Sequence, residues 1–248
     1  MSLLIFITGA IFGSFFYVVG TRLPNNESLI KPRSHCTNCK HALKFYELIP
    51  ILSYLVLRGR CHKCKQKISL KYLIYEIFTG TLFLISYLKF NISYEFFISL
   101  IISSLVVLIF ITDFQYMIIL DSPLIVAFVL VFILKWTYFD LDEALFSLVG
   151  GILAFITMLL IRQIGNIVFK KESLGGGDIK FFFLPGMILG YKFAIISLVL
   201  STFIALPYAV AMMFLNKDSE LPFGPFLVSS LFLVFYFGEK FQYLNYFI

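Results

Sequence analysis

The segment Ser103-Ser-Leu-Val-Val-Leu-Ile-Phe-Ile-Thr112 contains no charged residue and is followed directly by Asp113. It lies within a longer apolar stretch, residues 94–112, which has about the length of a helix that crosses a bilayer, roughly 20 residues. A carboxylate is costly to keep at the boundary of such a helix, so an acid in this place is a candidate functional residue. The segment therefore predicts a transmembrane helix that ends in a functional acid.

The composition of the whole chain agrees with a membrane protein. Of its 248 residues, 60% are hydrophobic, 19% are aromatic and only 14% are charged. A soluble fold of this size cannot bury so much apolar surface, whereas lipid accepts it. The net charge of +6 is concentrated in loops, which indicates membrane topology and argues against a nucleic-acid partner.

Apolar stretches recur along the chain and predict an all-α polytopic membrane protein with about eight transmembrane helices. The first stretch has no basic region before it and no small-residue cleavage site after it, so we expect a retained span and no removable signal peptide. The shortest stretch contains Pro185-Gly186. The stretches lie near residues 2–20, 72–90, 94–112, 117–137, 144–169, 179–190, 192–216 and 224–246.

Lysine and arginine are unequally shared between the two sides of the predicted membrane. If residues 21–71 are cytoplasmic, eleven basic residues there and five elsewhere place sixteen of the 20 on the cytoplasmic side. Because positive residues favour that side, we expect both termini outside and Asp113, Asp121 and Asp178 at the cytoplasmic boundary. The predicted segments are a first transmembrane helix (1–20), a cytoplasmic loop (21–71) and a membrane-embedded domain (72–248).

All four cysteines lie in the polar segment 21–71, as the pairs Cys36–Cys39 and Cys61–Cys64. Each Cys-x-x-Cys pair can present two sulfurs from one tight turn, and four thiolates form a closed tetrahedral site typical of structural zinc. We therefore expect reduced thiolates and no disulfides. A closed site leaves no position for a substrate, so the zinc is expected to stabilise a loop too small for its own core. Three histidines are expected to flank the ligands without joining them: His35, His41 and His62.

The run Gly175-Gly176-Gly177-Asp178-Ile179-Lys180 stands between two apolar stretches. Three glycines in succession let the chain turn freely, so we expect Asp178 on an open, flexible backbone facing Asp113. Two carboxylates that share a proton can cut a peptide, one as general base on water and the other as general acid. Boundary acids also cap helix N-termini, and the residues alone leave both interpretations open.

This run resembles the Gly-x-Gly-Asp-x-Lys element of type IV prepilin peptidases, the bacterial leader peptidases of pili, competence pseudopili and type II secretion. Further segments resemble the same family in the same order, and the likeness covers most of the chain. They are Gly13–Val19 with Arg22-Leu-Pro24, the two cysteine pairs, Ile49-Pro50, Ser53–Leu55, Leu57–Cys61, Tyr72, Glu76 with Thr79-Gly80, the spacing of Asp113 and Asp121, and Pro222–Phe226.

The resemblance implies a membrane aspartyl endopeptidase with Asp113 and Asp178 as its catalytic pair, facing the cytoplasm from the bacterial inner membrane. The implied substrate is a prepilin or pseudopilin with a short basic leader, a glycine before the cut, usually Phe after it, and an apolar helix lying in lipid. Substrate approach and loop flexibility are expected of Gly175, Gly176, Gly177 and Lys180. The family also methylates the new N-terminus from S-adenosylmethionine, at a site that the sequence does not locate.

Four further acids are expected on the same side of the membrane. They are either receptors of the basic leader or solvated, and the solvated role is the interpretation we favour: Asp121, Glu172, Asp218 and Glu220.

Two other function classes are compatible with the residues. A transporter would use Asp113 and Asp178 as a proton or cation relay, with the cysteine loop as a metal sensor. Relays usually place their acids near the bilayer midplane, between repeats, whereas these acids lie at one face and no repeat is visible. A non-catalytic membrane scaffold would instead use the zinc loop to dock a partner.

Overall fold

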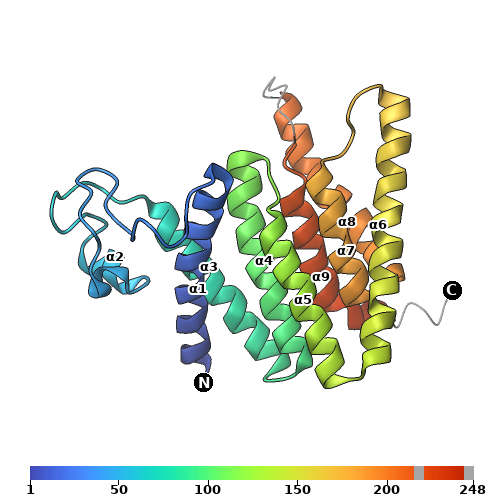
Figure 1. The fold of residues 1–248 in the computed structure, drawn as a ribbon, viewed down its shortest axis with the longest axis horizontal. Helices are drawn as coiled ribbons and strands as arrows, with labels where there is room; N and C mark the ends of the chain where they lie inside the picture. Colours follow the sequence, from blue (N-terminus) through green and yellow to red (C-terminus); the bar gives the residue numbers. More distant parts are fainter. Residues whose placement is uncertain (215–220, 243–248) are drawn as a thin grey trace. The chain divides into compact units, whose positions relative to one another are not determined.

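The computed structural model describes residues 1–214 and 221–242 (Figure 1). Within these residues the secondary structure is helical, with nine α-helices, two short 3₁₀ turns and no strand beyond two isolated bridges. The prediction of an all-α membrane protein is confirmed. The chain divides into two compact units, residues 1–96 and 97–248. Asp218, Glu220 and the ends of the last two apolar stretches lie outside the described residues.

The first unit is built on the close packing of α1 (Ser2–Arg22) against α3 (Leu70–Phe90). Small residues face each other across this contact. The Cα of Gly80 lies 2.8 Å from where a Cβ of Gly9 would be placed. Small residues let the backbones of membrane helices approach closely, and van der Waals contacts then hold the pair together.

One buried carboxylate connects the cysteine loop to this helix pair. Glu76, on α3, is 6% exposed. Its Oε2 accepts a hydrogen bond from the backbone N–H of Ile51 at 2.7 Å, and it also bonds the side chain of Ser14 on α1. Ile51 precedes the short helix α2 (Leu52–Val56), which lies between the two cysteine pairs. Glu76 thereby fixes the middle of the loop against the two helices.

The second unit contains the longest helices of the described chain, and α4 is the most buried of them. The apolar window of α4 is 67% buried, more than in any other long helix of the described residues. A helix that is buried over most of its surface can be apolar on most sides, and residues 98–112 of α4 contain no charged residue. The helices of this unit are α4 (Tyr94–Tyr116), α5 (Asp121–Tyr138), α6 (Leu141–Phe169), α7 (Gly176–Leu189), α8 (Tyr191–Phe214) and α9 (Gly224–Gln242).

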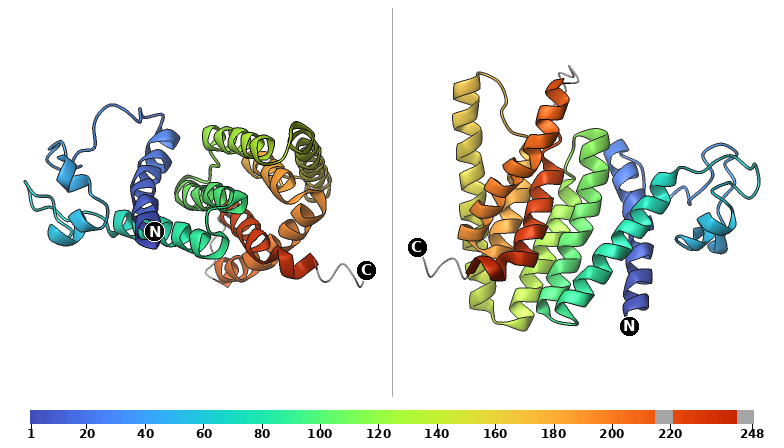
Figure 2. Two further views of the ribbon diagram at one scale, coloured as in Figure 1. Left: turned by 90° about the horizontal axis from the view of Figure 1, so that it is seen from below. Right: turned by 180° about the vertical axis from the view of Figure 1, so that it is seen from behind.

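Helix ends from distant parts of the sequence meet at one end of the second unit. The last turn of α4 and the first turns of α5, α7 and α9 all lie toward the upper end in Figure 1, and the rear view of Figure 2 agrees. The 29 residues of α6 make it about 43 Å long at 1.5 Å per residue. Its last turns consequently extend beyond the start of α7 (Figure 1).

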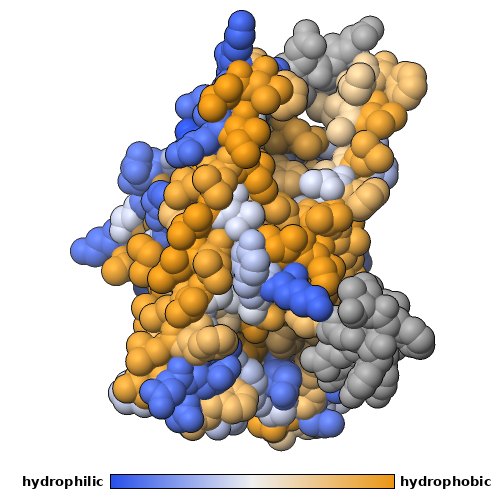
Figure 3. Space-filling view, turned by 90° about the vertical axis from the view of Figure 1, so that its right-hand side faces the viewer, coloured by the Kyte–Doolittle hydropathy of each residue, from blue (hydrophilic) through white to orange (hydrophobic). Residues whose placement is uncertain are grey.

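Six helices of the described residues are long and apolar enough to cross a membrane: α1, α3, α4, α5, α6 and α8. Of the other two predicted spans, α9 is apolar over Gly224–Gly238, and α7 has 14 residues. At 1.5 Å per residue, α7 covers about 21 Å and is shorter than the hydrocarbon core of roughly 30 Å. The face shown in Figure 3 is mostly apolar, as expected for a surface that meets lipid.

Candidate active site and metal centre

Asp113 lies in the last turn of α4 and is 6% exposed. Its Oδ2 accepts a hydrogen bond from the backbone N–H of Gly224 at 3.0 Å. Gly224 is the first residue of α9, and the first N–H groups of a helix have no partner within the helix and favour anions. The start of α9 therefore holds the Asp113 carboxylate in place.

Asp178 is the third residue of α7, and the beginning of its own helix restrains it. Its carboxylate bonds the backbone N–H of Gly175, the residue that caps α7. The charge of Asp113 acts on Asp178, so the two carboxylates are electrostatic neighbours although they are 65 residues apart in the chain. The second unit thus brings together the two predicted acids, one from the last turn of α4 and one from the first turn of α7.

The glycine run is not the open loop that the sequence analysis expected. Helix α7 begins at Gly176, so Gly176 and Gly177 are helical and only Gly175 lies outside the helix. A Cβ on Gly177 would lie 2.9 Å from the Cβ of Ile119, whereas a Cβ on Gly176 would meet nothing within 4 Å. Close packing therefore requires a glycine at 177, while the backbone at 176 has open space beside it.

Ile119 is a site residue that the sequence analysis missed. It lies in the linker between α4 and α5 and is 8% exposed. It contacts the first turn of α7 at Gly177 and also that of α9, where a Cβ on Gly224 would lie 3.0 Å from Ile119 Cδ1 and 2.9 Å from Asp113 Oδ2. Ile119 thereby lies between the first turns of α7 and α9 and keeps them apart beside the acids. An isoleucine within an apolar stretch carries no signal of this role, whereas Gly224 stands in the Pro222–Phe226 motif.

Lys180 joins α7 to α5 through an ion pair. Its Nζ lies 2.9 and 2.8 Å from the two carboxylate oxygens of Asp121. Both side chains are more than half exposed, and exposed pairs contribute only about 0–1 kcal/mol. Asp121 therefore has a lysine as its partner. The pair lies at a cavity of about 450 Å³ whose other lining residues are apolar: Leu124, Ile125, Phe128, Phe155 and Phe183.

The four cysteines of the first unit converge on one point. Their ligand atoms all lie within 4.8 Å of one another, with Sγ separations of 3.8 Å for Cys36–Cys64 and 3.9 Å for Cys39–Cys61. Four sulfurs around a zinc ion at about 2.3 Å would form a tetrahedron with edges of about 3.8 Å. The cysteines are free thiols, and their arrangement fits a bound metal ion.

The two cysteine turns have the same backbone design. In the first, the N–H of Lys40 donates to the carbonyl oxygen of Cys36, and in the second the N–H of Lys65 donates to that of Cys61, both at 3.0 Å. Lys40 and Lys65 adopt φ values of 55° and 60°. The backbone N–H groups of Cys39 and Asn38 lower the pKa of the Cys36 thiol, which favours the thiolate that binds metal.

The histidines do not belong to this cluster of possible ligands. His41 instead places Nε2 3.4 Å from Oε2 of Glu47. The backbone N–H of Lys44 and the neighbouring His41 lower the pKa of this buried glutamate, although burial opposes them. His41 therefore supports the loop through Glu47.

Comparison with known proteins decides the family. Residues 7–90 match the Bacterial Peptidase A24 N-terminal domain, and residues 100–210 match the Type IV leader peptidase family. The Prepilin leader peptidase/N-methyltransferase of Bacillus subtilis is 35% identical over 241 residues, which cover 96% of this chain and 94% of that protein. The chain belongs to the type IV leader peptidase family. No solved structure matches it significantly.

A second relative leads to the same leader peptidase family. The Prepilin leader peptidase/N-methyltransferase of Vibrio cholerae is 30% identical over 246 residues, which cover 93% of this chain and 94% of that protein. Family membership confirms the resemblance noted in the sequence and gives no support to a transporter. Together with six helices able to cross a membrane, it identifies this leader peptidase as a bacterial inner-membrane protein.

Proposed function

We propose that this chain is a membrane aspartyl endopeptidase that removes the short basic leader from type IV prepilins or pseudopilins. The observation that carries the proposal is the meeting of Asp113 and Asp178, each restrained by a backbone N–H at the start of a helix. The names of the relatives support the reaction and the substrate class.

The proposed reaction uses the two acids as one unit. Neighbouring carboxylates hold one proton between them, so we assign the base and the acid to the pair jointly. The ionised carboxylate takes a proton from water as the oxygen attacks the scissile carbonyl carbon, and the protonated acid donates to the carbonyl oxygen. When the tetrahedral intermediate collapses, the amide C–N bond breaks and the carboxyl group that took the water proton gives it to the leaving amine. The other carboxylate regains its proton from a hydroxyl group of the intermediate, so the pair returns to its starting state. The products are the leader with a new carboxyl group and the pilin with a free N-terminus.

We place this chemistry at the cytoplasmic boundary of the membrane. Sixteen of the 20 basic residues lie on the cytoplasmic side in this orientation, as membrane insertion favours. Residues 21–71 are then a cytoplasmic loop, and residues 72–248 form the membrane-embedded peptidase domain. The apolar helix of the substrate lies in the surrounding lipid and brings the scissile bond to the level of the acids. The open space beside Gly176 suits the approach of the substrate backbone.

We propose zinc as the metal of the cysteine cluster, held by Cys36, Cys39, Cys61 and Cys64. The sulfur separations support this assignment because they match a tetrahedral thiolate site. Zinc would supply folding stability to a loop that is too small for a core of its own. With four protein ligands it has no open position for a substrate, so its proposed role is structural.

Replacing Cys36 and Cys61 by Ser should remove the metal and loosen the loop without directly altering the acid pair. Metal binding and folding of a small loop are coupled, with apparent binding energies of about 10–16 kcal/mol in zinc-finger peptides. Elemental analysis should show loss of bound zinc, and hydrogen exchange should rise in residues 36–67 more than in α4. A fully stable, metal-free wild-type protein would show that the metal is dispensable.

We also propose that the protein methylates the new N-terminal amine, as the names of the relatives state for those proteins. S-adenosylmethionine is the proposed methyl donor. No residue of this chain is assigned to it.

Purified protein incubated with a synthetic prepilin should release the leader with or without S-adenosylmethionine. With the methyl donor, mass spectrometry should also show one added methyl group on the mature N-terminus. Intact prepilin under both conditions would refute the peptidase proposal. Cleavage without methylation would refute the second activity alone.

A further inference from the structure

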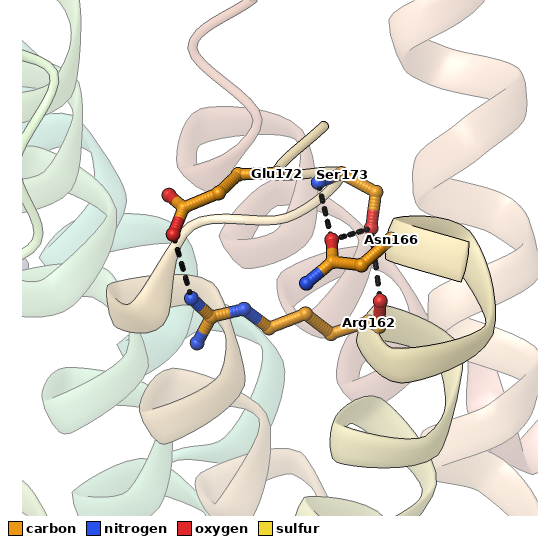
Figure 4. Close-up of polar contacts among 4 residues, drawn as sticks. All are labelled: Arg162, Asn166, Glu172 and Ser173. Atoms are coloured by element: carbon orange, nitrogen blue, oxygen red, sulfur yellow. Dashed lines mark hydrogen bonds and ion pairs between the residues drawn. The ribbon is translucent and has the colours of Figure 1, made fainter. Parts of the chain in front are cut away.

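The segment between α6 and α7 leads directly into the proposed active site. Residues 170–175 end at Gly175, whose N–H bonds the Asp178 carboxylate. Ser173 is attached to the last turns of α6 (Figure 4). Its backbone N–H donates to Asn166 Oδ1 at 2.8 Å. Its hydroxyl lies 3.1 Å from the same Oδ1 and 3.2 Å from the carbonyl oxygen of Arg162.

The surface of α6 is shaped to receive Ser173. A Cβ on Gly165 would lie 2.7 Å from the Cβ of Ser173 and closer still to its Oγ. Only a residue without a side chain allows Ser173 to approach the helix at this point. Three positions therefore act together, and we name Gly165, Asn166 and Ser173 the α6 clasp.

The nearby ion pair between Arg162 and Glu172 contributes much less than the α6 clasp to holding this segment against α6. Its atoms are 3.3 Å apart, and the Glu172 side chain is 83% exposed. Such exposed pairs contribute about 0–1 kcal/mol. Ser173 uses the main-chain oxygen of Arg162, so the Arg162 side chain can be removed without breaking the clasp.

Because α6 is long, its last turns reach the segment that connects it to α7, and the clasp forms there. The helix has 29 residues, whereas about 20 are enough to cross the hydrocarbon core. Its last turns extend past the start of α7 (Figure 1) and carry Gly165 and Asn166 beside the connecting segment. Ser173 is two residues from Gly175, which limits their separation to about 7 Å. Anchoring Ser173 therefore restricts where α7 can begin.

We infer that the α6 clasp consists of positioning residues that fix the start of α7, and thereby Asp178, relative to Asp113. This inference rests on the proposed peptidase function. The contact of Gly177 with Ile119 holds the first turn of α7 against the linker that follows α4, and the clasp holds the segment that leads into that turn. Both restraints are needed because two carboxylates share a proton only at a defined separation.

The test compares Asn166→Ala with Arg162→Ala in prepilin cleavage by the full-length protein in detergent. Asn166→Ala removes the acceptor of the Ser173 N–H, and kcat should fall about 10- to 100-fold, the cost typical of misplacing a catalytic group by about 1 Å. The KM for the synthetic prepilin should stay within about twofold, since the clasp does not bind substrate. Arg162→Ala removes only the exposed ion pair and should keep kcat within about twofold.

Two further readouts separate positioning from loss of folded protein. The pH range of maximal kcat should narrow in Asn166→Ala. Acids that lie farther apart repel each other less, so the two pKa values of the pair lie closer together and the singly protonated pair exists over a smaller pH range. Misfolding would instead lower the rate equally at every pH. Gly165→Ala should also lower kcat by displacing Ser173, and adding Ser173→Gly should restore part of the loss by removing the colliding side chain.

Failure of the inference is distinguishable from failure of the proposed function. A wild-type protein that cuts no prepilin would refute the function itself. If the wild type cleaves and Asn166→Ala retains its kcat and pH profile, the clasp has no positioning role. Equal losses in Asn166→Ala and Arg162→Ala would also overturn the inference.

Discussion

Replacing Asp113 or Asp178 by Asn should abolish prepilin cleavage while the protein still folds and inserts. The amide has nearly the same shape, and its oxygen can still accept the N–H of Gly224 or Gly175. It cannot hold and release the proton that peptide hydrolysis requires. Because each acid takes part in proton transfer, we expect a loss of at least about 10³-fold in kcat. Cleavage of a synthetic prepilin by the purified variants measures this loss.

Asp121→Asn is the matched control for these substitutions. Asp121 is an acid at the same end of the second unit, but it is more than half exposed and pairs with Lys180. Losing an exposed pair costs about 0–1 kcal/mol, so kcat should change only a few-fold. If Asp113→Asn or Asp178→Asn cleaves at nearly the wild-type rate, the catalytic pair is wrongly assigned.

Replacing Gly224 or Gly177 by Ala should lower kcat strongly, whereas replacing Gly176 should not. In Gly224→Ala the new Cβ would lie 2.9 Å from Asp113 Oδ2, and in Gly177→Ala it would lie 2.9 Å from Ile119 Cβ. Both changes push a helix start away from the acids, and we expect kcat to fall about 100-fold, as for other misplacements of about 1 Å.

Gly176→Ala separates packing from flexibility. Its Cβ would meet nothing within 4 Å, and alanine favours a helix over glycine by up to about 1 kcal/mol. The variant should therefore fold normally and keep its kcat, and a rise in KM alone would show that the substrate backbone passes there. Prepilin cleavage gives kcat and KM for Gly224→Ala, Gly177→Ala and Gly176→Ala, and thermal unfolding gives their stability. A large loss of kcat in Gly176→Ala, equal to that in Gly177→Ala, would contradict the packing argument and favour a flexible glycine loop.

The parts of the site that local sequence encodes were predictable. Each Cys-x-x-Cys turn depends on a few consecutive residues, and the apolar stretches already outline α1, α3, α4, α5, α6 and α8. The acids could be selected because a carboxylate at the end of an apolar segment is costly. The helical state of Gly176 and Gly177 was not predictable. Their low helix propensity suggested a loop. In the structure they form the first turn of α7, and the packing of Gly177 against Ile119 overrides that propensity.

Amino-acid order by itself determined the membrane class, the four thiols that could hold a metal ion and the two acids worth testing, because hydrophobicity, spacing and charge are local properties of the chain. Only the tertiary structure decided that Gly224 holds Asp113, that Ile119 separates the starts of α7 and α9, and that Ser173 is attached to α6. These contacts join residues up to 111 positions apart. They exist because helices distant in the chain pack side by side, and no local pattern records which helix becomes the neighbour of which.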